Sequence, residues 1–250
     1  MELLLNSNKV SNRYFYPRYS TFENPYYVES GNNQLACYYH KIENPKKTII
    51  HFHGNGEVVS DYLSLSFASK IEALGCSILF AEYRSYGLST GDSPTLVGML
   101  EDVEKIIKSI DIPPQEIVLF GRSVGSIYAL HGASVFPNIA GLVIESGIAD
   151  VVGRVLKLIR KPKTVIKEQM REEGKIYFDH EKKIKEFQGQ TLVMHTLYDS
   201  LVHSSNAKKL YEWANEPKEL KLFLQGDHND IFLVNEEEYF RVLGEFVDGL

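Results

Sequence analysis

The sequence contains few of the residues that define several large classes of protein. Only two cysteines occur in 250 residues, Cys37 and Cys76, which is too few for a disulfide framework. Both lie in apolar stretches typical of strands, so we expect buried packing residues and a reducing compartment. Positive charge is also scarce. Because 27 Lys and Arg face 33 Asp and Glu, the formal charge of −6 offers no general basic face for nucleic acid.

Long apolar runs are absent as well. No window approaches the roughly 18 apolar residues of a membrane-spanning helix. The first residues, MELLLNSNKV, lack the basic start and the longer apolar run of a signal peptide. We therefore expect a soluble, cytoplasmic protein. Nothing in the sequence indicates an oligomeric state.

The sequence does contain a regular alternation of apolar strands and amphipathic helices. Residues 25–53 hold three strand-like runs separated by turn residues, and a helical pattern follows over 58–73. Later strands are expected at 77–83, 116–120, 140–146, 191–195 and 221–225, and later helices at 94–110, 126–136, 205–215 and 236–249. This alternation predicts an α/β fold, with a mostly parallel sheet covered by helices on both faces and an antiparallel edge at its N-terminal end.

Length and pattern favour one domain over residues 1–250. Residues 148–187 are too many for a single crossover helix. We expect an insertion there, broken by Pro162 and Gly174, that forms a small helical cap over the edge of the sheet.

The pentapeptide Gly121-Arg-Ser123-Val-Gly125 stands between an expected strand and an expected helix. In a turn this sharp the serine backbone is strained, and side chains at both flanking positions would collide, which explains the two glycines. The turn presents the Ser123 hydroxyl at the carboxyl edge of the sheet, where it could act as a nucleophile. The alternative is a Gly-Ser turn in which Ser123 only caps a helix.

A serine nucleophile needs a base and a carboxylate, which follow in the order Ser, Asp or Glu, His in this kind of fold. His228 follows the 221–225 strand, and we interpret it as the base. Asp199 follows the 191–195 strand and is our candidate acid. The alternatives for the acid are Asp150, after the 140–146 strand, and Asp227 and Asp230, which we expect to shape the loop.

Acyl transfer also needs backbone amides that bind the developing oxyanion. We expect one from Val124, which follows the nucleophile. The second should come from the loop His51-Phe-His53-Gly54-Asn55-Gly56-Glu57, and we assign it to Asn55, with Gly54 and Gly56 as alternatives.

We expect neither a metal nor another cofactor. His51 and His53 form a pair, but the next residues, GNGEVV, supply no further aspartate or histidine ligand. A dinucleotide fingerprint would need a third glycine where Val59 stands. His53 is better explained as a brace for its loop.

Five stretches together resemble the α/β-hydrolase superfamily: HFHGNGE at 51–57, YRSYGLSTG at 83–91, GRSVGS at 121–126, Asp199-x-x-Val202, and GDHND at 226–230. The nearest branch holds monoglyceride-lipase-like, serine-aminopeptidase-like and depalmitoylase-like enzymes. The resemblance implies a catalytic triad of Ser123, Asp199 and His228, with oxyanion donors at Asn55 and Val124. It departs at Thr196, where those relatives often have glycine, and in lacking the N-terminal cysteine cluster that membrane-bound depalmitoylases carry.

We therefore predict a serine hydrolase of small-molecule carboxylic esters or thioesters. A serine aminopeptidase and a non-catalytic binding protein are the alternatives. Residues 151–167 carry six cations and no acid: Arg154, Lys157, Arg160, Lys161, Lys163 and Lys167. They form either a solvated face of the cap or a surface for anionic substrates or lipid headgroups.

Overall fold

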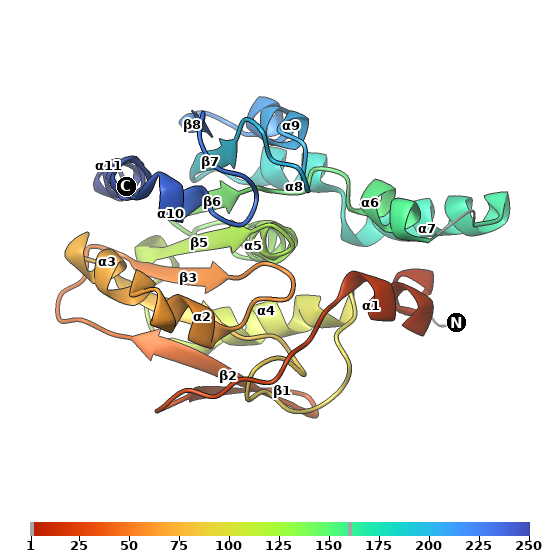
Figure 1. Ribbon diagram of the computed structural model, residues 1–250, viewed down its shortest axis with the longest axis horizontal. Coiled ribbons are helices and arrows are strands. Elements are labelled where there is room, and N and C mark those ends of the chain that lie inside the picture. Colours follow the sequence, from red (N-terminus) through yellow and green to blue (C-terminus); the bar gives the residue numbers. More distant parts are fainter. Residues whose placement is uncertain (1–2, 160–161) are drawn as a thin grey trace.

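The computed structural model describes residues 3–159 and 162–250. Within these ranges one sheet has the strand order β1-β2-β4-β3-β5-β6-β7-β8 (Figure 1). Its eight strands are β1 (Tyr26–Ser30), β2 (Asn33–His40), β3 (Thr48–Phe52), β4 (Ser77–Ala81), β5 (Ile117–Arg122), β6 (Gly141–Glu145), β7 (Gln190–Thr196) and β8 (Lys218–Phe223). Strand β2 pairs antiparallel with β1 and β4, and the other neighbours are parallel. The predicted α/β class with its antiparallel edge is confirmed.

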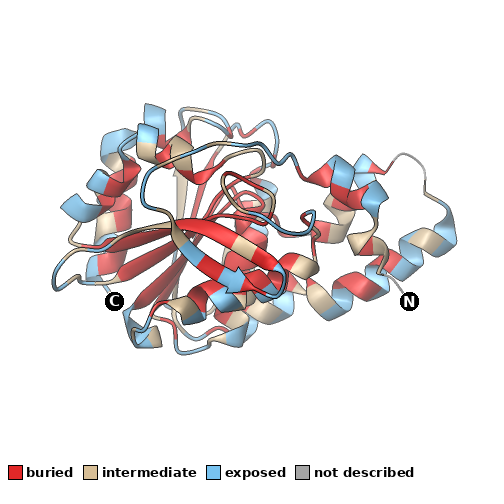
Figure 2. Cartoon of the chain, turned by 90° about the horizontal axis from the view of Figure 1, so that it is seen from below, coloured by how far each residue is buried: buried red, intermediate tan, exposed pale blue. Residues whose placement is uncertain are grey.

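Helices cover both faces of this sheet. On one face the core includes side chains of α4 (Gly98–Ser109), α5 (Gly125–Val135), α8 (His180–Glu186) and α9 (Ser205–Trp213). On the other it includes side chains of α2 (Val59–Ser64), α3 (Phe67–Ala73), α10 (Ile231–Val234) and α11 (Glu236–Asp248). Because helices pack on both sides, every residue of β3, β4, β5 and β6 is buried (Figure 2).

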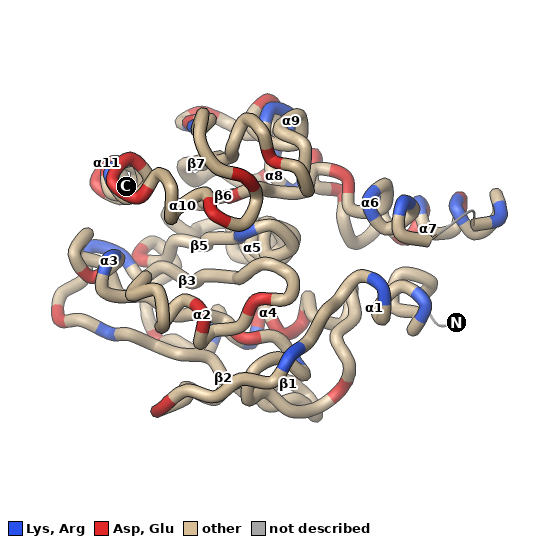
Figure 3. Tube along the Cα trace, viewed as in Figure 1, with Lys and Arg blue, Asp and Glu red and all other residues tan. Residues whose placement is uncertain are grey.

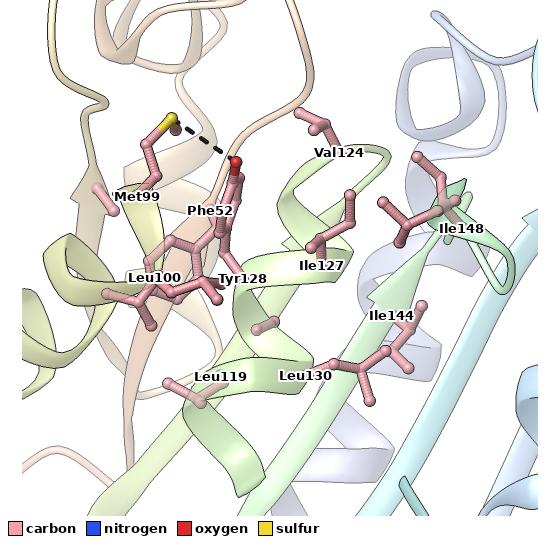
Figure 4. Close-up of a cluster of buried hydrophobic side chains, with 14 of the residues drawn as sticks. Phe52, Met99, Leu100, Leu119, Val124, Ile127, Tyr128, Leu130, Ile144 and Ile148 are labelled. Carbon is pink, nitrogen blue, oxygen red and sulfur yellow. Dashed lines mark hydrogen bonds between the residues drawn. The ribbon is translucent and has the colours of Figure 1, made fainter. Parts of the chain in front are cut away.

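The core beneath α5 fixes the start of that helix. Ile127, Tyr128 and Leu130 of α5 pack with Phe52 and Leu119 of the neighbouring strands (Figure 4). The Tyr128 hydroxyl also donates a hydrogen bond to Met99 Sδ of α4, at 3.6 Å. Close packing of this kind holds the turn between β5 and α5 in one conformation.

Two local predictions need correction. The helix expected over 58–73 is two helices, because Ser66 between α2 and α3 adopts a left-handed conformation with φ of 56°. Gly174 was expected to break the insertion, but it lies inside α7 (Thr164–Tyr177), where a Cβ would come within 2.2 Å of Val152. Pro162 does lie between α6 (Val151–Leu158) and α7.

The N-terminal residues form the 3-10 turn η1 (Leu4–Asn6) and α1 (Asn8–Tyr14). These elements pack with α6 and α7 beyond the carboxyl ends of the strands, and we call the four together the projection (Figure 1). The buried carboxylate of Glu173 in α7 accepts hydrogen bonds from the Leu4 and Leu5 amides, both at 2.9 Å. This contact attaches the N-terminal segment to the insertion between β6 and β7.

Within residues 3–159 and 162–250, no helix combines the length and the apolar character that crossing a bilayer requires.

Candidate active site

Ser123 lies in the sharp turn between β5 and α5. Its φ of 53° is a left-handed conformation that is rare for a non-glycine residue. A Cβ on Gly121 would come within 2.5 Å of the Gly125 carbonyl oxygen, and a Cβ on Gly125 within 2.0 Å of the Phe52 carbonyl oxygen. The backbones of this turn and of the loop after β3 therefore approach each other as only glycine permits.

The structure brings Ser123, His228 and Asp199 into one chain of hydrogen bonds. His228 Nε2 lies 2.9 Å from Ser123 Oγ, and His228 Nδ1 lies 2.7 Å from Asp199 Oδ2. All three residues are buried, with Ser123 only 7% exposed. They come from the ends of β5, β7 and β8, because the carboxyl ends of parallel strands share one edge of the sheet.

The environment of Asp199 favours its ionised form. Burial alone would raise the pKa of this carboxyl group, but hydrogen bonds from His195 and His228 outweigh burial and hold the pKa well below its usual range. Its Oδ1 accepts the amides of Leu201 and Val202, at 2.9 and 2.6 Å. An ionised Asp199 fixes His228 in the tautomer whose Nδ1 carries hydrogen, which leaves Nε2 as a proton acceptor.

The alternative acids have other partners. Asp150 caps α6 by accepting the Gly153 amide at 2.8 Å. Asp227 accepts the Ser200 amide and hydroxyl, both at 2.7 Å, and Asp230 accepts the Asp227 amide at 2.6 Å. Asp227 and Asp230 thus hold the loop around His228, as their positions in the sequence suggested.

The two amides assigned to the oxyanion site have no acceptor in the described part of the chain. Neither the Asn55 nor the Val124 N–H donates a hydrogen bond within residues 3–159 and 162–250. The Gly54 amide, one of the alternatives, donates to Glu57 Oε2 at 2.6 Å. Binding an oxyanion through the Gly54 amide would break that bond. The Asn55 and Val124 amides could donate to an oxyanion without breaking a hydrogen bond of the described residues.

The Asn55 side chain forms hydrogen bonds with the N-terminal segment. Its Oδ1 accepts the Tyr16 amide at 3.1 Å and the Tyr86 hydroxyl at 2.9 Å, and its Nδ2 donates to the Tyr14 carbonyl oxygen. The N-terminal segment therefore helps to set the conformation of the loop after β3. The sequence offered no signal for this contact.

The two histidines of that loop have structural surroundings. His51 lies among aromatic rings, with centroids 4.5 Å from Tyr62 and 4.8 Å from Phe120. His53 Nε2 lies 2.7 Å from Glu82 Oε1 and its Nδ1 lies 2.7 Å from the Gly54 carbonyl oxygen. Burial alone would lower the pKa of His53, but Glu82 outweighs burial and raises it. In the described residues no three His, Cys, Asp or Glu side chains are grouped to hold a metal ion.

Sequence reasoning missed the part played by Arg122. Its guanidinium is buried and contacts two carboxylates, Glu57 and Glu145, and the backbone carbonyl oxygen of His228. Burial alone would lower the pKa of Arg122, but Glu57 and further acidic neighbours outweigh burial and raise it. The guanidinium is therefore charged.

The chain is similar to several known proteins. It is 28% identical to protein YfhR of Escherichia coli K12 over 205 residues, which are 80% of this chain and 69% of that protein. It is 25% identical to human alpha/beta hydrolase domain-containing protein 17B over 228 residues, 87% of this chain and 72% of that protein. No protein-family model matches.

Solved structures agree with the described architecture. Alpha/beta hydrolase domain-containing protein 10 from mouse superposes with a TM-score of 0.71 at 19% identity, covering 90% of this chain and 99% of that one. The Pyrococcus furiosus esterase Pf2001 superposes with a TM-score of 0.70 at 20% identity, covering 90% and 91%. The chain has the α/β-hydrolase fold. The resemblance seen in the sequence is confirmed.

Several cations lie on the projection, and others lie elsewhere, including α3 and α9 (Figure 3). Arg154 and Lys157 of α6 line a cavity of about 450 Å³ that also borders Asp199 and His203, and Arg154 donates to the Leu201 carbonyl oxygen at 2.8 Å. Lys163 and Lys167 are exposed, before and within α7. Arg160 and Lys161 lie outside the described residues. Two of the six predicted cations thus lie beside the candidate site.

Proposed function

We propose that the protein is a serine hydrolase that cleaves carboxylic ester or thioester bonds through an acyl-enzyme. The observation that carries the proposal is the hydrogen-bonded chain from Ser123 Oγ through His228 to the buried Asp199 carboxylate. This order of groups is what converts a serine hydroxyl into a nucleophile. The comparisons support the same class of reaction, because similar folds belong to a Pyrococcus furiosus esterase and a Paleococcus ferrophilus monoacylglycerol lipase.

In the first half of the reaction, Ser123 Oγ attacks the acyl carbonyl carbon and His228 Nε2 takes the hydroxyl proton. The carbonyl π electrons move to oxygen, and the amides of Asn55 and Val124 stabilise that oxyanion. Asp199 stabilises the imidazolium without taking its proton. The oxyanion then re-forms the carbonyl, the bond to the alcohol or thiol breaks, and His228 gives its proton to the leaving group.

In the second half, water attacks the acyl-serine ester. His228 Nε2 takes one proton from the water, and the same amides stabilise the second oxyanion. Collapse of this intermediate releases a carboxylic acid and returns the proton to Ser123 Oγ. The cycle uses only groups of this chain and water.

The substrate proposal includes an anionic group that binds beside Arg154 and Lys157, in a cavity that neither Ser123 nor His228 lines. Arg154 and Lys157 line the cavity that borders Asp199, in a molecule whose formal net charge is −6. A carboxylate or phosphate on the substrate would gain from these cations, because a concave site focuses their field. A neutral ester of the same alcohol would not have this electrostatic attraction.

The test is active-site labelling with a fluorophosphonate probe, which phosphonylates an activated serine. Wild type should be labelled, and Ser123→Ala and His228→Ala should not. The matched control is Ser134→Ala, which removes another serine of α5 and should be labelled like wild type. Labelling that survives Ser123→Ala would refute the proposal. Hydrolysis of p-nitrophenyl esters, acyl thioesters and aminoacyl anilides would then separate esterase, thioesterase and peptidase activity.

A further inference from the structure

We propose that Arg122 is a positioning residue that holds the nucleophile turn, the oxyanion loop and the His228 loop in one arrangement. The inference rests on the proposed serine-hydrolase function. It assigns a role to the variable second residue of the Gly-x-Ser-x-Gly pattern, which in this chain precedes the nucleophile directly.

Three nitrogens of one guanidinium reach three different segments. Arg122 Nη2 donates to the His228 carbonyl oxygen at 2.7 Å. Nη1 forms an ion pair with Glu57 Oε1, and Nε lies 3.0 Å from Glu145 Oε1. Since Arg122 is also the last residue of β5, its backbone and its side chain together connect the nucleophile to both loops.

The contact with Glu57 continues into the oxyanion loop. Glu57 Oε2 accepts the Gly54 amide at 2.6 Å and the Tyr62 hydroxyl at 2.7 Å. A Cβ on Gly54 would lie 2.3 Å from Arg122 Nη1, so the loop backbone rests directly on the guanidinium. Asn55, the proposed oxyanion donor, is the next residue after Gly54. Movement of Arg122 would therefore move the amide of Asn55.

The contact with His228 acts on the base itself. The carbonyl oxygen that Arg122 binds belongs to the same residue whose ring lies between Ser123 and Asp199. The ring nitrogens face Ser123 and Asp199, while the backbone faces Arg122. A shift of this backbone by about 1 Å would lengthen the bond to Ser123, and misplacement of that size can cost about 100-fold in rate.

Lysine cannot make these contacts. An ammonium group is a single point of charge on a flexible chain, whereas the guanidinium presents donors in fixed directions. Glu145 is itself held by the Tyr239 hydroxyl at 2.5 Å, so the carboxylates cannot simply move towards a shorter cation. Arg122→Lys therefore keeps the positive charge but loses the simultaneous contacts with Glu57, Glu145 and the His228 carbonyl oxygen.

A buried ion cluster that only stabilises the fold could make contacts of the same kind as Arg122. Arg84 is a buried arginine of that kind and serves as the control. Arg84 is buried and binds Asp102 through two hydrogen bonds, of 2.7 and 2.6 Å. The pair joins the chain after β4 to α4 and contacts none of the proposed catalytic groups. Arg84→Lys therefore weakens a buried Arg–carboxylate pair and lowers the stability of the fold, without moving Ser123, Asn55 or His228.

The experiment measures kcat, KM and thermal stability for wild type, Arg122→Lys, Arg84→Lys and Glu57→Gln on one chromogenic ester. We expect Arg122→Lys to lower kcat by about 10- to 100-fold while KM changes less than about threefold. Arg84→Lys should lower the melting temperature comparably and leave kcat within about twofold of wild type. Glu57→Gln should lower kcat, and combining it with Arg122→Lys should add little further loss, because both act through one contact.

The result that would overturn the inference is an Arg122→Lys variant that loses stability as Arg84→Lys does but keeps its kcat. Equal loss of kcat in both arginine variants would overturn it too, because the effect would then follow stability. The rate of fluorophosphonate labelling gives the same comparison without turnover, should a variant fold too poorly for kinetics at higher temperature. Failure of the proposed function is separate, since wild type itself would then go unlabelled.

Discussion

Nε2 of His195 lies 3.3 Å from the same Asp199 oxygen, Oδ2, that accepts the hydrogen bond of His228. The same nitrogen lies 2.7 Å from the Val202 carbonyl oxygen, so it carries the hydrogen. His195 is fully buried in β7, and it fixes both the Asp199 carboxylate and the loop that follows it.

We predict that His195→Phe lowers kcat about tenfold. The substitution removes the donor that binds the Val202 carbonyl oxygen and lies 3.3 Å from Asp199 Oδ2, while Asp199 keeps the bonds from His228, Leu201 and Val202. The measurement is kcat on a chromogenic ester beside the melting temperature. An unchanged kcat in a folded variant would mean that the other three bonds position Asp199 unaided.

The choice of acid leads to a second prediction. Asp199→Asn should lower kcat by roughly 10⁴-fold, because the amide no longer selects the His228 tautomer that accepts a proton at Nε2. Asp150→Ala is the matched control, since it removes only the cap of α6. It should cost about 1 kcal/mol of stability and leave kcat within a few-fold of wild type. The opposite ranking of the two variants would identify Asp150 as the acid.

The third prediction concerns Gly125. Gly125→Ala should destabilise the fold by about 2 kcal/mol or more, because its Cβ would meet the Phe52 carbonyl oxygen at 2.0 Å and backbone must move. Gly244→Ala in α11 is the control. There the nearest atom is the end of the Leu74 side chain, at 3.1 Å, and helix propensity favours alanine. Urea unfolding measures both, and equal stabilities would contradict the steric argument.

The sequence predicted the parts of the site that depend on local stereochemistry. Gly121 and Gly125 indicate the sharp turn because no larger residue fits there, and Asp199 and His228 follow strands whose ends meet at one edge. Contacts between distant segments left no such pattern. Arg122 meets Glu57 and His228 across 65 and 106 residues, and Glu173 meets Leu5 across 168. Each of these polar residues reads in the sequence as an ordinary surface charge.

Short-range breaks escaped prediction for a different reason. The apolar positions over 58–73 suit one continuous helix, and only the left-handed Ser66 separates α2 from α3. Gly174, a weak helix former, nevertheless lies within α7, where Val152 occupies the space that a side chain at this position would need. At this position tertiary packing favours glycine although local propensity does not.

The fourth prediction is a loss of stability in mild acid. Burial, followed by the charge of Lys183, lowers the pKa of His180 from 6.5 to about 4, and its Nδ1 lies 2.8 Å from the Ile148 carbonyl oxygen. Between these values the unfolded chain binds a proton that the folded chain does not, so the free energy of unfolding falls as pH decreases from about 6.5 to about 4. The full difference is roughly 3 kcal/mol.

His180→Gln should remove this contribution to the pH dependence. Above pH 7 the variant is expected to be less stable than wild type by a constant amount, because it loses the bond to Ile148. Below pH 6.5 the gap should narrow, as only wild type keeps a buried histidine that resists protonation. Urea unfolding at a series of pH values gives both curves. Parallel curves down to pH 4 would show that His180 does not contribute to the slope.

The last prediction tests whether the cations beside Asp199 select the substrate. Two esters of the same chromogenic alcohol are compared, one with a carboxylate on its acyl chain and one neutral ester of equal length. Raising the salt concentration from about 50 to 300 mM should lower kcat/KM for the anionic ester about three- to tenfold, because salt screens exposed charges, and should change kcat/KM for the neutral ester less.

Arg154→Gln and Lys157→Gln should each reduce both the preference for the anionic ester and the salt dependence of that preference. Lys105→Gln, an exposed cation of α4, should behave as wild type. Equal salt dependence for the two esters would leave these cations as a solvated face of the projection, with no part in choosing the substrate.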